Sequence, residues 1–128
     1  MSHFTNLKTS FRNVLYLEKA LTKLNIDYKK QNTQMSHFNM SDLIINQLNG
    51  HDIKFCWKDQ EYELVVDTSF WDQPYPLESF IDTISQQYAS DVIVGEANKL
   101  GFQPVKYKQN QDGSKVIILE RWNSTNDF

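Results

Sequence analysis

Three histidines and several aspartates are the side chains of this 128-residue chain that could ligate a metal ion. His3, His37 and His51 are far apart, and no two of them have the short spacing that presets a metal site on one strand or helix. A site would therefore need the fold to bring a histidine beside a carboxylate such as Asp52 or Asp67. We interpret the histidines as turn and surface residues, and we predict neither a metal site nor a bound cofactor.

Cys56 is the only cysteine, which excludes an intramolecular disulfide and a cage of cysteine ligands. It lies between Phe55 and Trp57 in an alternating segment, so its side chain should point to the opposite face of a strand. A nucleophilic pair with His51 would need both groups on one face, whereas five residues of strand place them on opposite faces. We predict an inert thiol.

The remaining candidates for functional residues lie in and beside the loop of residues 68–75. Asp67 and Asp72 flank Phe70 and Trp71 and could act as paired carboxylates, although capping of turns is the favoured role. Aromatic residues gathered in one loop either cover the core as a lid or anchor a partner protein. Both alternatives stay open, and the predicted partner-binding residues are Phe70, Trp71, Asp72 and Tyr75.

Binding of nucleic acid is a weaker alternative. Aromatic side chains on a sheet can stack on RNA bases, and Phe55, Trp57 and Tyr62 would form such a platform. The same face is needed as the core, however, and the net charge is −3 with no run of lysine and arginine. The four glycines are isolated, so there is no glycine-rich phosphate loop.

These candidates lie on and around a predicted β-hairpin. Apolar and polar residues alternate in two runs that are separated by the short polar segment of residues 58–60, which is the pattern of two half-buried strands joined by a turn. The residues expected on the buried face are Ile53, Phe55, Trp57, Tyr62, Leu64 and Val66.

Three helices are predicted to cover that face. The first begins after the N-cap Asn13 and ends at Asn25, which can take a left-handed conformation. The second begins at Pro76, and the third runs from Asp91 to Leu100 after Ser90 as its N-cap. The helical residues expected in the core include Leu17, Leu21, Phe80 and Ile84.

Further strands are predicted at residues 3–11, 26–31, 42–47, 103–108 and 115–122. The weakly apolar strand 26–31 is expected at an edge. Val116 to Leu119 are apolar on both faces, which is typical of a strand in the interior of a sheet. The predicted fold class is α+β, with a largely antiparallel sheet of about six or seven strands and three helices packed on one face.

The chain length fits one domain, which we predict over residues 1–122 and follow with a polar C-terminal tail, 123–128. No apolar run approaches the ~20 residues of a membrane-spanning helix. The N-terminus has neither an apolar signal core nor a transit segment rich in arginine and serine. We therefore expect the protein to remain in the compartment where it is synthesised.

Short motifs along almost the whole chain are together specific. They include Asn49-Gly50-His51-Asp52-Ile53, the run Glu61 to Asp67 followed by Phe70-Trp71, Gln87-Tyr88-Ala89, and Asp112-Gly113-Ser114 before Arg121-Trp122. With the opening Met1-Ser2-His3-Phe4, the chain resembles the family of hypothetical chloroplast reading frame thirty-five. The resemblance implies a plastid protein of the stroma, and it implies no reaction, cofactor or catalytic residue.

We therefore expect a non-catalytic protein-interaction or assembly module with a protein partner in the plastid stroma. Two alternatives stay open, namely an accessory subunit of a plastid enzyme and a weak binder of single-stranded RNA. The oligomeric state is left open by the sequence.

Overall fold

The structure is a computed structural model that describes residues 3–32 and 41–121. These residues belong to two compact units, Met1–Tyr88 and Ala89–Phe128. The predicted single domain over residues 1–122 stays a prediction. His37 and the predicted polar tail lie outside the described residues.

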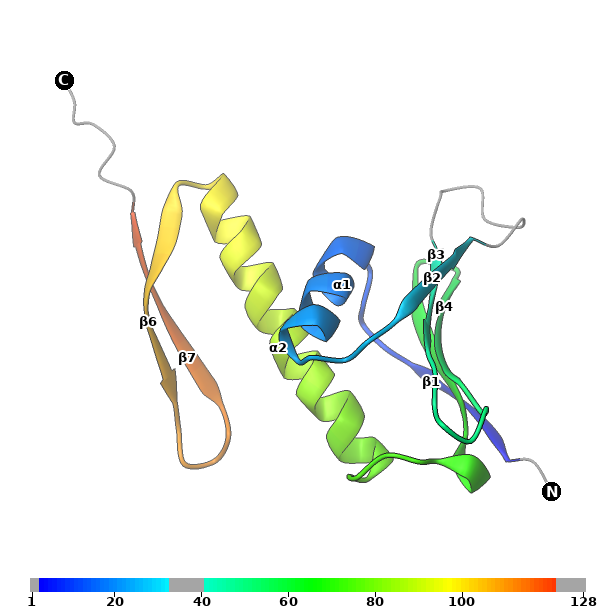
Figure 1. Cartoon of the computed structure of the whole chain (residues 1–128). Coiled ribbons are helices and arrows are strands. Elements are labelled where there is room, and N and C mark those ends of the chain that lie inside the picture. The colour runs from blue at the N-terminus through cyan, green and yellow to red at the C-terminus, as the bar shows by residue number, and fades with distance from the viewer. Residues whose placement is uncertain (1–2, 33–40, 122–128) are drawn as a thin grey trace. The chain divides into compact units, whose positions relative to one another are not determined.

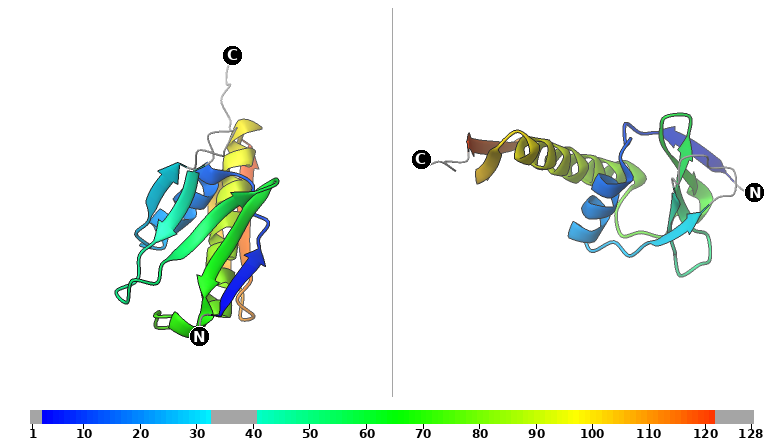
Figure 2. Two further views of the ribbon diagram at one scale, coloured as in Figure 1. Left: turned by 90° about the vertical axis from the view of Figure 1, so that its right-hand side faces the viewer. Right: turned by 90° about the horizontal axis from the view of Figure 1, so that it is seen from above.

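The first unit contains a five-stranded antiparallel sheet in the order β1-β5-β4-β3-β2. Figure 1 labels most of these strands, and Figure 2 shows α1 and the first turns of α2 together on one face of the sheet. The bounds are β1 Phe4–Lys8, α1 Val14–Lys23, β2 Lys29–Asn32, β3 Ser41–Ile45, β4 Ile53–Lys58, β5 Glu61–Asp67 and the short 3-10 helix η1 Thr68–Phe70. The class α+β with a largely antiparallel sheet is confirmed.

The central hairpin β4–β5 forms as its alternation predicts. Phe55 pairs with Leu64 and Trp57 with Tyr62, and the chain turns at Asp59, whose φ is 62°. The predicted inner side chains are fully buried except for Trp57, which is only half-buried. Trp57 lies one residue before the end of β4 and packs edge-on against Tyr62, with ring centroids 5.2 Å apart.

The helical cover of this core follows from local signals. The Asn13 side chain accepts hydrogen bonds from the backbone N–H groups of Leu15 and Tyr16, which confirms it as the N-cap of α1. Asn25 has a φ of 59°, the left-handed conformation predicted for the end of this helix. The four helical core residues named from the sequence are buried, namely Leu17, Leu21, Phe80 and Ile84.

Two predictions about the second half of the chain are wrong. The predicted second and third helices are one continuous helix, α2 Leu77–Lys99, so Ser90 lies within it and caps nothing. No glycine or proline interrupts the segment around Ser90. Continuing a helix adds one backbone hydrogen bond per residue, whereas a new helix must pay for nucleation, so a single serine does not end it.

The sheet was also predicted too large. Strands β6 Phe102–Gln109 and β7 Lys115–Arg121 form a separate two-stranded antiparallel sheet in the second unit. Within the described residues β7 therefore has one neighbour, although Val116 to Leu119 predict a strand in a sheet interior. A sequence pattern reports which faces of a strand are apolar, and it does not report which sheet the strand joins.

Candidate functional site

The aromatic loop of residues 68–75 is held firmly where it leaves β5. Asp67 is the N-cap of η1, and its Oδ1 accepts hydrogen bonds from the backbone N–H groups of Ser69 at 3.0 Å and His3 at 3.1 Å. The backbone N–H and hydroxyl of Thr68 both donate to the His3 carbonyl, at 2.9 and 3.1 Å. Asp67 therefore has the capping role, and the first turn of the loop is tied to the segment that leads into β1.

Gln47, which follows β3 and is only 7% exposed, fixes the middle of the loop. Its Nε2 donates to the carbonyls of His51 and Phe70, the latter at 3.1 Å. Its Oε1 accepts from the backbone N–H of Asp72 at 2.8 Å. Asn49 adds a second bond to the Phe70 carbonyl, at 2.8 Å. One carboxamide therefore joins the β3–β4 connection to both ends of the Phe70–Asp72 turn.

Two aromatic side chains of the loop remain accessible. Phe70 is 38% exposed and stacks on the imidazole of His51, with ring centroids 3.7 Å apart and an interplanar angle of 4°. Tyr75 is 39% exposed and stacks on the buried Phe80, with centroids 5.9 Å apart. Each ring thus rests on a second ring, which restricts its rotamers while leaving part of it in contact with solvent.

Trp71 has a different position from these two rings. It is half-buried, its Nε1 donates to the Tyr75 carbonyl at 2.7 Å, and its ring packs edge-on against Phe80 at 5.2 Å. These contacts brace the loop from within. Trp71 therefore contributes to packing within the loop, whereas Phe70 and Tyr75 are more exposed to solvent.

Several residues at this site do not stand out in the sequence. Leu48 is fully exposed and lies between Gln47 and Asn49, which both donate to the Phe70 carbonyl. A single leucine in the polar connection that follows β3 gives no sequence signal of an exposed contact residue. We define the loop surface as Leu48, His51, Phe70, Asp72 and Tyr75.

Cys56 lies on the sheet face opposite Phe55, as predicted, and is half-buried. Burial, followed by the charge of Asp42, raises the pKa of the Cys56 thiol to about 11. Because the thiolate is the reactive species, this shift leaves about a hundredfold less of it at neutral pH than the ordinary value of 9.0 would.

We expect iodoacetamide to label Cys56 in the folded protein about a hundredfold more slowly at pH 7 than in the unfolded chain. The rate should rise about tenfold per pH unit and level off only near pH 11. Mass spectrometry of quenched samples measures both rates. Equal rates in folded and denatured protein at pH 7 would show that the thiol is reactive.

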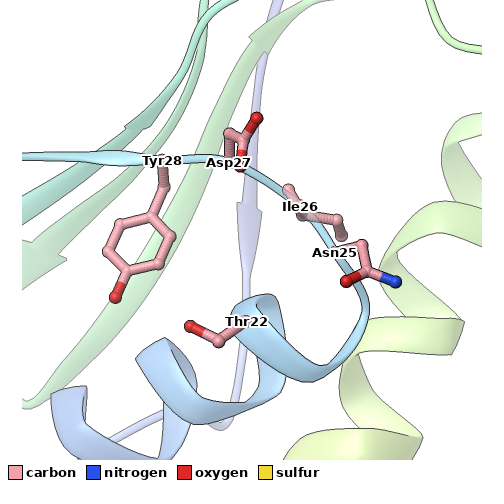
Figure 3. Close-up of a pocket in the computed structure, with 5 residues that line it drawn as sticks. All are labelled: Thr22, Asn25, Ile26, Asp27 and Tyr28. Carbon is pink, nitrogen blue, oxygen red and sulfur yellow. The ribbon is translucent and has the colours of Figure 1, made fainter.

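Metal ligation has no support in the described parts of the chain, where no three side chains of histidine, cysteine, aspartate or glutamate are grouped to hold an ion. A pocket beside the end of α1 is another candidate, and Figure 3 shows its lining residues Thr22, Asn25, Ile26, Asp27 and Tyr28. The lining comes from one turn of chain, and the Tyr28 hydroxyl is already bonded to Glu18 at 2.9 Å. The loop surface is therefore the stronger candidate.

The sequence profile of a family described as "Protein of unknown function (DUF1257)" matches residues 20–118. The chain belongs to this family.

Its similar relatives are plastid proteins. The "Uncharacterized protein ycf35" of Trieres chinensis is 54% identical over 93% of this chain and 97% of its own length. The proteins of the same name from Pyropia yezoensis and Guillardia theta are each 36% identical, over 96% and 95% of this chain and 99% and 98% of their own. The resemblance in the motifs is thereby confirmed, and the chain is a plastid protein of a family of unknown function.

No solved structure matches the chain. Among the residues described here, no helix is both long and apolar enough to span a membrane.

Proposed function

We propose that this protein is a non-catalytic interaction or assembly module of the plastid stroma, and that its loop surface contacts a protein partner. The observation that supports the proposal is that two exposed aromatic rings are held in place by contacts with the rest of the first unit. Phe70 is stacked on His51 and Tyr75 on Phe80, while Gln47 and Asn49 hold the Phe70 backbone. Side chains that are already ordered lose little entropy on binding, which favours their use as contact anchors.

The composition of the loop surface supports a protein as the partner. Leu48 adds a fully exposed aliphatic side chain beside the stacked rings, and Asp72 is exposed at the rim. Apolar and aromatic centres with a polar rim are typical of protein interfaces. A partner that supplies an apolar pocket for Phe70 or Tyr75 would fit this surface.

The two alternatives differ in their support. The RNA platform predicted from Phe55, Trp57 and Tyr62 loses its basis, because Phe55 and Tyr62 are 0% exposed within the core. An accessory subunit of a plastid enzyme would use the same kind of surface as an assembly module. The identity and activity of the captured partner separate these two functions.

The test compares tagged protein carrying Phe70→Ala and Tyr75→Ala with the wild type in capture from plastid stroma. We expect the double variant to capture at least about tenfold less of its partner than the wild type does, because two contact anchors are removed. The matched control is Leu15→Ala, which removes a side chain of α1 that is 64% exposed and lies outside the loop surface. Trp71 is left unchanged because its bracing contacts would confuse lost binding with lost folding.

Thermal unfolding of each variant accompanies the capture experiment. The proposal requires the double variant to stay folded and the Leu15→Ala protein to keep its partner. A folded double variant that retains every wild-type partner would leave the loop with a structural role only.

A further inference from the structure

The hairpin β6–β7 of the second unit leaves several apolar side chains exposed. No side chain from Phe102 to Arg121 is fully buried. Val116 and Ile118 are 39% and 44% exposed on one face of β7, and Ile117 and Leu119 alternate with them on the other face. Strands that are apolar on both faces normally have a neighbour along each edge, and an isolated two-stranded hairpin is marginally stable.

Only one of the two hairpin edges is suited to accept another strand. Strand β6 contains Pro104 and a register shift between Pro104 and Lys106, and both features blunt a sheet edge. Strand β7 has neither feature along its seven residues, and among the described residues it pairs with β6 alone. An added strand would therefore form its backbone hydrogen bonds with the outer edge of β7.

The charged residues at the two ends of β7 indicate which side chains an added strand should have. Lys115 and Arg121 stand at its two ends on the face that also presents Ile117 and Leu119. The Arg121 guanidinium lies 4.8 Å from the ring centre of Phe102, its cross-strand neighbour, which holds it on this face. A strand added here meets a cation at each end and aliphatic side chains between them, so its complement has carboxylates at both ends.

A second copy of the chain does not satisfy this pattern. Antiparallel pairing of β7 with itself at full overlap would place Lys115 opposite Arg121 at both ends of the new ladder. Like charges directly opposite each other in a sheet are destabilising. A shifted register would separate these charges, but it would give up backbone pairs.

We propose that β7 is a docking edge for an extended segment of another protein, with an acidic side chain at each end and aliphatic side chains between them on the same face. The segment adds to the hairpin as a third strand. This surface lies in the second unit and is distinct from the loop surface, so the inference goes beyond the function proposed above. With both surfaces occupied, one chain would hold two different segments.

The binding test uses the full chain and two labelled seven-residue peptides. The five interior residues of both peptides alternate threonine and valine. One peptide has glutamate at both ends, and the other has lysine at both ends. We expect the glutamate-ended peptide to bind about tenfold more tightly or better at low salt, because two attractive pairs replace two repulsive ones. This preference should fade in 1 M salt, where surface charges are screened. Fluorescence anisotropy measures both affinities.

Charge reversal on the protein provides the matched comparison. The variant Lys115→Glu with Arg121→Glu should prefer the lysine-ended peptide. The control Lys106→Glu with Lys108→Glu changes the net charge by the same amount on the other strand, and it should keep the preference for glutamate ends. Circular dichroism verifies that both variants fold as the wild type does. A control that reverses its preference as well would show bulk electrostatics and overturn the proposal.

Three further results would also overturn it. A peptide with an N-methyl group on every backbone amide has no N–H donor on either edge, so unchanged binding of such a peptide excludes strand addition. Displacement of the peptide by oligouridine would identify the hairpin as a nucleic-acid surface. Sedimentation that shows a dimer, lost in the variant with Lys115→Glu and Arg121→Glu, would identify a second copy as the occupant.

Discussion

Replacing Leu64 with alanine should lower the free energy of unfolding by about 2–5 kcal/mol. Leu64 is 0% exposed on β5, an interior strand of the five-stranded sheet, where it pairs with Phe55 on one side and with Leu7 on the other. Truncation removes buried methyl groups and leaves a cavity that the surrounding strands and helices cannot close fully. Chemical denaturation of wild type and variant measures the loss.

The control for this prediction is Val65→Ala, one position along the same strand. Val65 points to the opposite face of the sheet and is half-buried, so its truncation should cost less than the truncation of Leu64. A loss below about 1 kcal/mol for Leu64→Ala, or equal losses for both variants, would place the core on the wrong face.

Replacing Gln47 with leucine should destabilise the protein and loosen the aromatic loop at the same time. The carbonyls of His51 and Phe70 would lose a donor, and the Asp72 N–H would lose its acceptor. A fully buried polar group left unpaired costs about 1–3 kcal/mol, whereas these hydrogen bonds are part-buried and Asn49 still reaches the Phe70 carbonyl. We expect a loss of about 2–4 kcal/mol, with faster amide hydrogen exchange at Asp72.

The comparison variant is Gln73→Ala, which removes one side-chain partner of the Gln47 Oε1, at 3.1 Å, and leaves the backbone contacts in place. It should cost less than about 1 kcal/mol. If Gln47→Leu leaves both the stability and the exchange at Asp72 unchanged, the rigid mounting that supports the proposed function does not exist.

The parts of this protein that the sequence predicted correctly depend on neighbours along the chain. The alternation from Ile53 to Val66 specifies two strands and their inner face, since side chains of a strand alternate strictly. Asn13 and Asn25 mark the ends of α1 because capping and left-handed turns use local hydrogen bonds and local backbone angles. The apolar stripes of the helices identify core residues for the same reason.

The candidate site was predicted only in part. The aromatic residues between β5 and α2 stand out in the sequence, so Phe70, Trp71 and Tyr75 were available as candidates. Their separate roles were not, because Gln47 and Asn49 come from a connection more than 20 residues earlier. A buried glutamine with four hydrogen bonds has the same local signature as one in solvent.

The sequence by itself determined the approximate positions of the strands, the inner face of the central hairpin, the ends of the first helix and the family. Only the tertiary structure decided that residues 77–99 are one helix, that β6 and β7 form their own sheet, and that Phe70 faces solvent while Trp71 braces the loop. Periodicity and capping are properties of a few consecutive residues. Strand partners and side-chain exposure depend instead on which distant segments meet, and no short stretch of sequence contains that information.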